Sequence, residues 1–151
     1  MASCKDGFKR VAQIGIVVRD IEEALDFWCK LLKIERPRVI ETEEWEKTRA
    51  TYKGVPTRGR AKLAFIELDN VAIELIQPID GPSTWESQLN AHGQGVHHIA
   101  FVVEDIDGCV KELENFGGVR EQEGLFEGGR YLYADLLKTL GVRIELLQFF
   151  K

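Results

Sequence analysis

Four polar side chains interrupt stretches of the sequence that otherwise predict buried strands. Gln13 and His98 lie in apolar, β-branched runs, and Glu74 and Glu145 each stand between an isoleucine and a leucine in another such run. An unpaired charged group in a core strand is costly, so these residues indicate a function. One imidazole, two carboxylates and an amide oxygen would suit a divalent cation in an octahedral site with two open positions.

The four residues occupy equivalent positions in an internal repeat. Residues 11–21 (VAQIGIVVRDI) recur as residues 96–106 (VHHIAFVVEDI), and residues 73–77 (IELIQ) recur as residues 144–148 (IELLQ). A repeat of this kind predicts two copies of one structural unit. If a pseudo-twofold axis relates the copies, the four polar side chains converge on one point.

Each copy predicts a strand, a helix and three further strands. Asp20 and Asp105 are expected N-caps, and the apolar residues that follow them have helical spacing. The remaining strand candidates are residues 38–43, 48–53 and 62–68 in the first copy and residues 119–123 and 130–134 in the second. The extra length of the first copy, residues 45–60, predicts an extended hairpin.

These elements predict an α+β fold in a single domain, 1–151. Its two tandem β-α-β-β-β modules, at about residues 8–80 and 93–150, are expected to form a curved eight-stranded sheet around a cleft. A cleft of this kind would gather the four polar side chains from both modules.

Composition and charge narrow the function classes. The chain has 151 residues, a net charge of −5 and no basic stripe, which argues against nucleic acid as a partner. No apolar run approaches the roughly 20 residues that span a bilayer, and residues 1–10 lack a signal-peptide core. We therefore expect a cytoplasmic protein that acts on a small molecule, without a membrane partner.

The three cysteines share no spacing typical of a metal or redox motif. Cys29 and Cys109 fall in amphipathic stretches and are expected to be small buried apolar residues, and Cys4 is expected in a frayed terminus. Free thiols agree with a reducing compartment.

The two opening phrases, residues 11–21 and 96–106, resemble the half-motifs of the vicinal-oxygen-chelate superfamily. This superfamily includes glyoxalase I, extradiol dioxygenases, bleomycin- and fosfomycin-resistance proteins and methylmalonyl-CoA epimerase. The stretch 73–78 (IELIQP), then Ser83 and Leu89, then 93–101 (GQGVHHIAF), is most similar to the epimerase branch.

The resemblance implies a ligand set and a reaction. The metal ligands of the epimerase-like proteins correspond to Gln13, Glu74, His98 and Glu145. Either Glu145 or Glu74 can serve as the catalytic base, and the resemblance favours Glu145. The implied reaction removes and returns a proton on the carbon next to a carbonyl group, through an enolate. A homodimer is also expected.

Two departures from the epimerase pattern bear on the cofactor and the substrate. Gln13 stands where that branch usually has histidine, and a neutral amide oxygen is a weaker donor that favours Mn²⁺ or Mg²⁺ over Zn²⁺. The residues leave open Mn²⁺, Co²⁺, Mg²⁺, Ni²⁺ or Zn²⁺, and equally no metal, with Gln13 and His98 binding the enolate oxygen directly. Residues 134–141 (ADLLKTLG) lack the Gly- and Lys-rich loop of CoA-ester epimerases.

The substrate class therefore stays open between two kinds of carbonyl compound. A 2-substituted malonyl-type CoA thioester follows from the resemblance, whereas the missing loop and the aromatic residues favour a ketone such as the isoflavanone dihydrodaidzein. The aromatic residues outside the two helices are Trp45, Tyr52, Phe65, Trp85, Phe126, Tyr131 and Tyr133, and each belongs either to the core or to a cavity wall. The alternative functions are a drug-binding resistance protein and a glyoxalase-like lyase.

His97, next to His98, is expected to point to the opposite face of its strand and to have a structural role, because side chains alternate along a strand.

Overall fold

The computed structural model describes Cys4 and residues 7–151. Its strands are β1 (Gln13–Val17), β2 (Ile40–Glu41), β3 (Thr51–Tyr52), β4 (Val55–Pro56), β5 (Arg60–Glu67), β6 (Ala72–Asp80), β7 (Gly95–Val102), β8 (Val119–Phe126), β9 (Gly129–Leu136) and β10 (Val142–Phe149). Its helices are α1 (Ile21–Leu32), α2 (Trp45–Thr48), α3 (Thr84–His92) and α4 (Ile106–Asn115).

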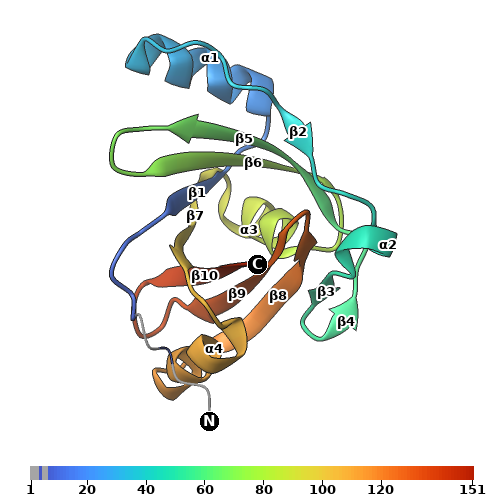
Figure 1. The fold of residues 1–151 in the computed structure, drawn as a ribbon. Coiled ribbons are helices and arrows are strands. Elements are labelled where there is room, and N and C mark those ends of the chain that lie inside the picture. The colour runs from blue at the N-terminus through green and yellow to red at the C-terminus, as the bar shows by residue number, and fades with distance from the viewer. Residues whose placement is uncertain (1–3, 5–6) are drawn as a thin grey trace.

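The strands form one strongly curved sheet in the order β2-β5-β6-β1-β7-β10-β9-β8-β3-β4 (Figure 1). The two opening strands, β1 and β7, pair antiparallel at its centre, and each has the closing strand of its own module, β6 or β10, as a parallel neighbour on the other side. This matching arrangement confirms the two-module fold predicted from the repeat.

The sheet of the described chain has ten strands and not the predicted eight. The two additional strands, β3 and β4, come from the extra segment of the first module and form the expected hairpin. The hairpin reaches across to the second module, where Thr51 and Tyr52 pair with Glu123 and Gln122 of β8. The strand candidate at residues 48–53 contains β3, but residues 45–48 of the predicted hairpin form helix α2, and the hairpin has no counterpart in the second module.

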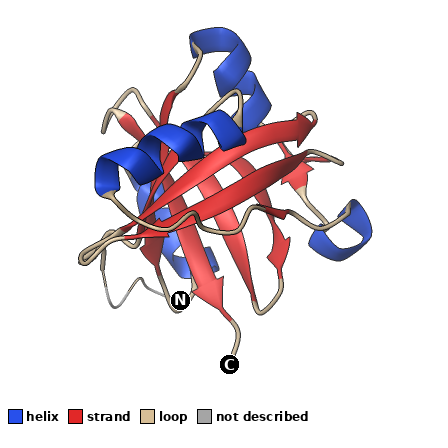
Figure 2. Ribbon diagram, turned by 90° about the horizontal axis from the view of Figure 1, so that it is seen from above, coloured by secondary structure: helices blue, strands red, loops and turns tan. Residues whose placement is uncertain are grey.

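Helices α1 and α4 each cover the outer face of their own module (Figures 1 and 2). The side chain of Asp20 accepts hydrogen bonds from two backbone amides at the start of α1, and Asp105 does the same for one amide of α4, as predicted. Each helix then buries its apolar stripe against strands of its own module, with Leu25 packed among the first-module residues and Val110 among those of the second.

A third long helix, α3, was not predicted from the sequence. It lies between the two modules on the inner side of the sheet (Figure 1). The hydroxyl oxygen of Ser83 accepts a hydrogen bond from the backbone N–H of Glu86 and begins the helix, so the Ser-x-x-Glu pattern was the available signal. Trp85 then packs against Val17 and Tyr133 in a buried inner cluster.

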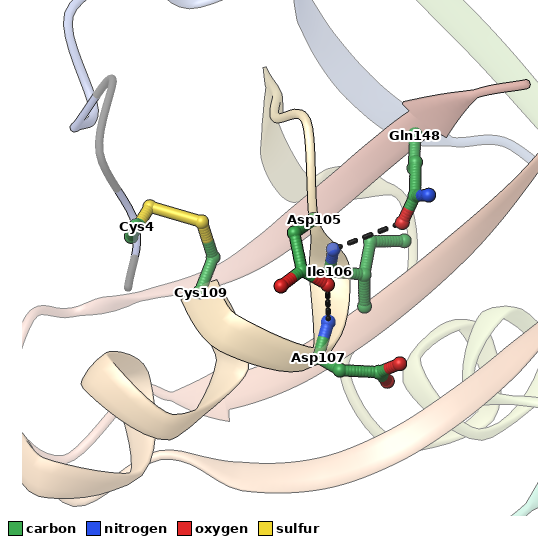
Figure 3. The surroundings of a disulfide bond; sticks show 6 residues. All are labelled: Cys4, Asp105, Ile106, Asp107, Cys109 and Gln148. Atoms are coloured by element: carbon green, nitrogen blue, oxygen red, sulfur yellow. Dashed lines mark hydrogen bonds between the residues drawn. A yellow bond between two sulfur atoms is a disulfide. The ribbon is translucent and has the colours of Figure 1, made fainter. Parts of the chain in front are cut away.

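The cysteine expectations were wrong for one pair. Cys4 and Cys109 form a disulfide that joins the start of the described chain to α4, with their Cα atoms 4.5 Å apart (Figure 3). The two residues are 105 positions apart in the chain, so no local spacing indicated the pair. Cys29 is free and half-buried. None of the helices in the described residues is long and apolar enough to cross a membrane.

Candidate active site

Glu74, His98 and Glu145 meet on the inner side of the sheet, as the repeat predicted. They come from β6, β7 and β10, and one nitrogen or oxygen atom of each lies within 4.8 Å of the others. Nε2 of His98 is 3.3 Å from Oε1 of Glu74 and 3.1 Å from Oε1 of Glu145. We call these three residues the Glu-His-Glu cluster.

Gly15 makes room for the imidazole ring at the centre of this cluster. It lies opposite His98 on β7 and beside Glu74 on β6, so it separates the two residues in the sheet. A Cβ atom on Gly15 would lie 2.0 Å from Cε1 of His98, far inside van der Waals contact. The ring therefore reaches Glu74 only because residue 15 has no side chain.

The facing atoms of the cluster are buried but lack hydrogen bonds of normal geometry. Glu74 is 6% exposed, Glu145 4% and His98 0%, and among the described residues none provides a partner for Oε1 of Glu74, Nε2 of His98 or Oε1 of Glu145. They lie at ion-pair distance, yet the imidazole does not aim a well-aligned N–H at either carboxylate. Three donor atoms directed at a shared point rather than at each other fit the coordination of a cation.

The electrostatics of the cluster depend on its burial. Desolvation raises the pKa of Glu74, and the charge of Glu145 raises it further, while His98 acts in the opposite direction. For His98 desolvation lowers the pKa, but the negative charges of Glu145 and Glu74 beside Nε2 outweigh it and raise the pKa to about 9. At neutral pH the cation-free cluster therefore retains a proton on the imidazole of His98.

Gln13 occupies the position in β1 that corresponds to His98 in β7. It is half-buried and lies opposite Ala100, which is the neighbour of Glu145 in the sheet. Gly15 faces the cluster, and residues two apart in a strand share a face, so Gln13 is on the inner side as well. Its role as the fourth ligand stays a prediction.

The expectation for His97 was wrong about its direction. In β7 the register slips, because Gly15 pairs with His98 and the next residue, Ile16, pairs with Val96. His97 is thus the extra residue of a β-bulge, which puts it on the same side as His98. The two Nδ1 atoms lie 2.9 Å apart, and His97 is fully buried. Strand alternation holds only where the register is regular.

Aromatic rings fill the inner side beside the cluster. Tyr133 lies with its ring centroid 4.9 Å from that of His98, and its hydroxyl accepts a hydrogen bond from Nε1 of Trp85 at 3.1 Å. Tyr131 packs against both of these aromatic residues. Trp85 and Tyr133 are buried members of the inner core, whereas Tyr131 is half-buried. Sequence reasoning had named all three without separating them from aromatic residues elsewhere.

The sequence model of the glyoxalase/bleomycin resistance protein/dioxygenase superfamily matches residues 12–133. The chain belongs to this superfamily. The fold also agrees, since a curved sheet built from two paired modules is the vicinal-oxygen-chelate fold that the resemblance implied.

Relatives within the superfamily include enzymes of two kinds. The chain is 30% identical over 146 residues to the uncharacterized protein YwbC of Bacillus subtilis, covering 95% of this chain and 98% of that protein. It is 29% identical to a probable lactoylglutathione lyase of Synechocystis, covering 88% and 90%. It is 27% identical to human mitochondrial methylmalonyl-CoA epimerase, covering 70% of this chain but only 52% of the human protein.

Solved structures of the superfamily share the fold. The methylmalonyl-CoA epimerase of Mycobacterium tuberculosis is similar with a TM-score of 0.63 at 19% identity, over 100% of this chain and 93% of that one. A Streptomyces coelicolor methylmalonyl-CoA epimerase in complex with 2-nitronate-propionyl-CoA is similar with a TM-score of 0.62 at 22% identity, over 95% and 99%.

Proposed function

We propose that this protein exchanges a proton on the carbon next to a carbonyl group, through an enolate. The observation that carries the proposal is the Glu-His-Glu cluster, whose facing atoms are buried and without hydrogen bonds. Such a reaction requires a base at the carbon and a positive or hydrogen-bonding group at the oxygen, and the cluster has residues of both kinds.

The energetic demand on the enolate oxygen is large. The pKa of a proton next to a carbonyl lies roughly twelve units above that of a near-neutral base, which corresponds to about 16 kcal/mol. Glu74, His98 and Glu145 would hold a divalent cation, with Gln13 as the fourth ligand, and a bound cation supplies positive charge to the developing enolate. Without a cation, the imidazolium of His98 and the amide of Gln13 would take that role.

We assign proton transfer to Glu145, with Glu74 as the second carboxylate. Both flank Nε2 of His98, so they can serve opposite faces of one carbon held at the cluster. Burial raises the pKa of Glu74, so this carboxylate takes up a proton more readily than a solvated one, as the returning group must. The resemblance to the epimerases favours Glu145 for the abstraction.

For the substrate we propose a small ketone of the isoflavanone type. Tyr133 packs against His98, and Tyr131 and Trp85 pack against Tyr133, so the aromatic surroundings of the cluster support a flat apolar molecule. The similarity to methylmalonyl-CoA epimerases supports the competing choice, a CoA thioester. A glyoxalase-like lyase is the second candidate function, because the Synechocystis lyase matches over nearly its whole length.

Two measurements test the proposal. Elemental analysis of the purified protein identifies a bound cation, and NMR in deuterated buffer follows deuterium uptake into dihydrodaidzein and methylmalonyl-CoA. We expect uptake next to the carbonyl of the ketone. Uptake into the thioester alone would assign the substrate to the CoA class. Conversion of the methylglyoxal–glutathione adduct to lactoylglutathione, without deuterium uptake into either test compound, would favour the lyase. Tight binding of a test compound without any of these reactions would favour a drug-binding protein.

The proposed role of Gln13 has its own test. Replacing it in the variant Gln13→His supplies an imidazole in place of an amide, so affinity for Zn²⁺, Co²⁺ and Ni²⁺ should rise. Calorimetric titration of metal-free wild type and variant with each ion measures the change. Unchanged affinity for all three ions would remove Gln13 from the ligand set.

A further inference from the structure

The contact between the two histidine rings bears on which nitrogen of a neutral His98 ring carries the hydrogen. Nδ1 of His97 and Nδ1 of His98 are 2.9 Å apart. A hydrogen bond between these atoms contains one hydrogen, so one ring donates and the other accepts. The contact alone does not say which, and the direction must come from the other side of His97.

That side is set by a threonine and an ion pair. Nε2 of His97 lies 3.1 Å from Oγ1 of Thr84, and the same oxygen lies 2.5 Å from Oε1 of Glu121. Glu121 also accepts a hydrogen bond from Nε of Arg143 at 2.5 Å, so it is a carboxylate that can only accept. Thr84 has one hydroxyl hydrogen and gives it to Glu121.

The direction of every other bond follows from this step. Because the Thr84 hydroxyl donates to Glu121, its oxygen accepts the Nε2 hydrogen of His97. Nδ1 of His97 then has no hydrogen and accepts from Nδ1 of His98. The hydrogen of a neutral His98 ring is therefore on Nδ1, and Nε2 is left bare between Glu74 and Glu145.

We propose that His97 is a positioning residue, oriented by Thr84 and the Glu121–Arg143 pair, which fixes the tautomer of His98 that can bind a cation or accept a proton. The inference rests on the function proposed for His98 and adds residues that act on it. If these hydrogen bonds ran in the opposite direction, the neutral His98 ring would carry its hydrogen on Nε2. That nitrogen could then neither coordinate a cation nor accept a proton.

Most members of this hydrogen-bonded series lie in the interior. His97 and Thr84 are each 1% exposed and Arg143 is 6% exposed. Arg143 also donates hydrogen bonds to the carbonyl oxygen of His97 at 2.9 Å and to Oε1 of Gln88 at 2.8 Å. Buried ion pairs contribute little net stability, so one that orients a neighbouring histidine has a reason beyond packing.

The test uses nitrogen NMR of histidine-labelled, metal-free protein, which reports the nitrogen that carries the hydrogen in each ring. We expect His97 with its hydrogen on Nε2 in wild type and in Thr84→Ser, which keeps the hydroxyl. Thr84→Val keeps the shape but removes the hydroxyl, so His97 should lose this single tautomer. Affinity for Mn²⁺, measured by calorimetry, should fall about 10- to 100-fold in Thr84→Val and recover in Thr84→Ser.

Thr57→Val is the matched control. It removes another buried hydroxyl, one that donates to the carbonyl oxygen of Pro82 and accepts from the N–H of Gly59, and it should leave the His97 spectrum unchanged. A wild-type spectrum with the His97 hydrogen on Nδ1 would overturn the proposal, even if Thr84→Val failed to fold. So would Thr84→Val with an unaltered spectrum and unaltered Mn²⁺ affinity. Wild type that shows the expected tautomer but binds no Mn²⁺ would support the positioning role and count against the cation in the proposed function.

Discussion

His98 competes with any incoming cation for the negative charge of its two neighbours. Its raised pKa, about 9, means that a proton occupies the middle of the metal-free cluster at neutral pH. The raised pKa of Glu74 acts in the same direction. A cation that binds at the cluster must therefore displace the proton of His98.

We therefore expect Mn²⁺ uptake by the metal-free protein to release protons and to strengthen as the pH rises toward 9. Below the pKa of His98 the gain should be up to about tenfold per pH unit for each displaced proton, and it should level off above it. Calorimetry in two buffers of different ionisation heat counts the released protons. Affinity that stays constant across this range, with no proton release, would mean that His98 is not a ligand.

The carboxylate assignment is tested with Glu145→Gln. The amide keeps the size of the side chain but cannot take a proton, so exchange of the substrate proton should fall by a factor on the order of 10²–10⁴. Ligand affinity should change much less, since the surrounding core is intact. NMR compares deuterium uptake at equal folded concentrations. Normal uptake here, with loss in Glu74→Gln, would transfer the role to Glu74.

Gly15 offers a steric test of the same site. In Gly15→Ala the added methyl meets the His98 ring, so we expect a loss of stability of about 1–3 kcal/mol and weaker Mn²⁺ binding. Gly95→Ala is the control, because a Cβ on that strand glycine has no atom within 4 Å. Denaturant unfolding and calorimetry compare the two variants. Equal behaviour would show that the ring moves aside at no cost.

At the scale of elements, each closing strand is tied to the helix of its own module. Oε1 of Gln77 accepts a hydrogen bond from the backbone N–H of Ile21 at 2.9 Å, and Oε1 of Gln148 accepts one from Ile106 at 3.0 Å (Figure 3). This explains why each closing strand has a glutamine three residues after its glutamate. The strand that carries each carboxylate is thereby fixed against the start of α1 or α4.

Removing either tie should destabilise the protein to a similar degree. Gln77→Ala and Gln148→Ala each leave a helix N–H without its partner, at an expected cost of about 1 kcal/mol. The two losses should add in the double variant, since the sites lie in different modules. Urea unfolding monitored by circular dichroism gives the values. A double variant no less stable than either single one would show that water replaces the amide.

At the scale of the whole molecule, the sequence could predict the modules and three clustered residues because the repeat states their symmetry directly. It could not predict the direction of His97, which depends on a bulge in β7, nor the disulfide of Cys4 and Cys109, which joins distant segments. Helix α3 was overlooked because its capping pattern is short and its apolar face is weak. Local sequence patterns identify the repeated elements. The features they did not predict depend on contacts between segments that are distant in the sequence.

The hairpin of β3 and β4 has a consequence for how two copies of this chain could exchange parts. In a duplicated fold, the first half of one molecule is built to recognise the second half of any other, which invites domain swapping. Here β3 belongs to the first module by sequence but pairs with β8 of the second, and α3, the helix between the modules, packs its buried Trp85 against both modules on the inner side of the sheet. Two chains that exchanged modules would have to break the β3–β8 pairing and the contacts of α3. The geometry therefore favours a chain whose two modules pair with each other.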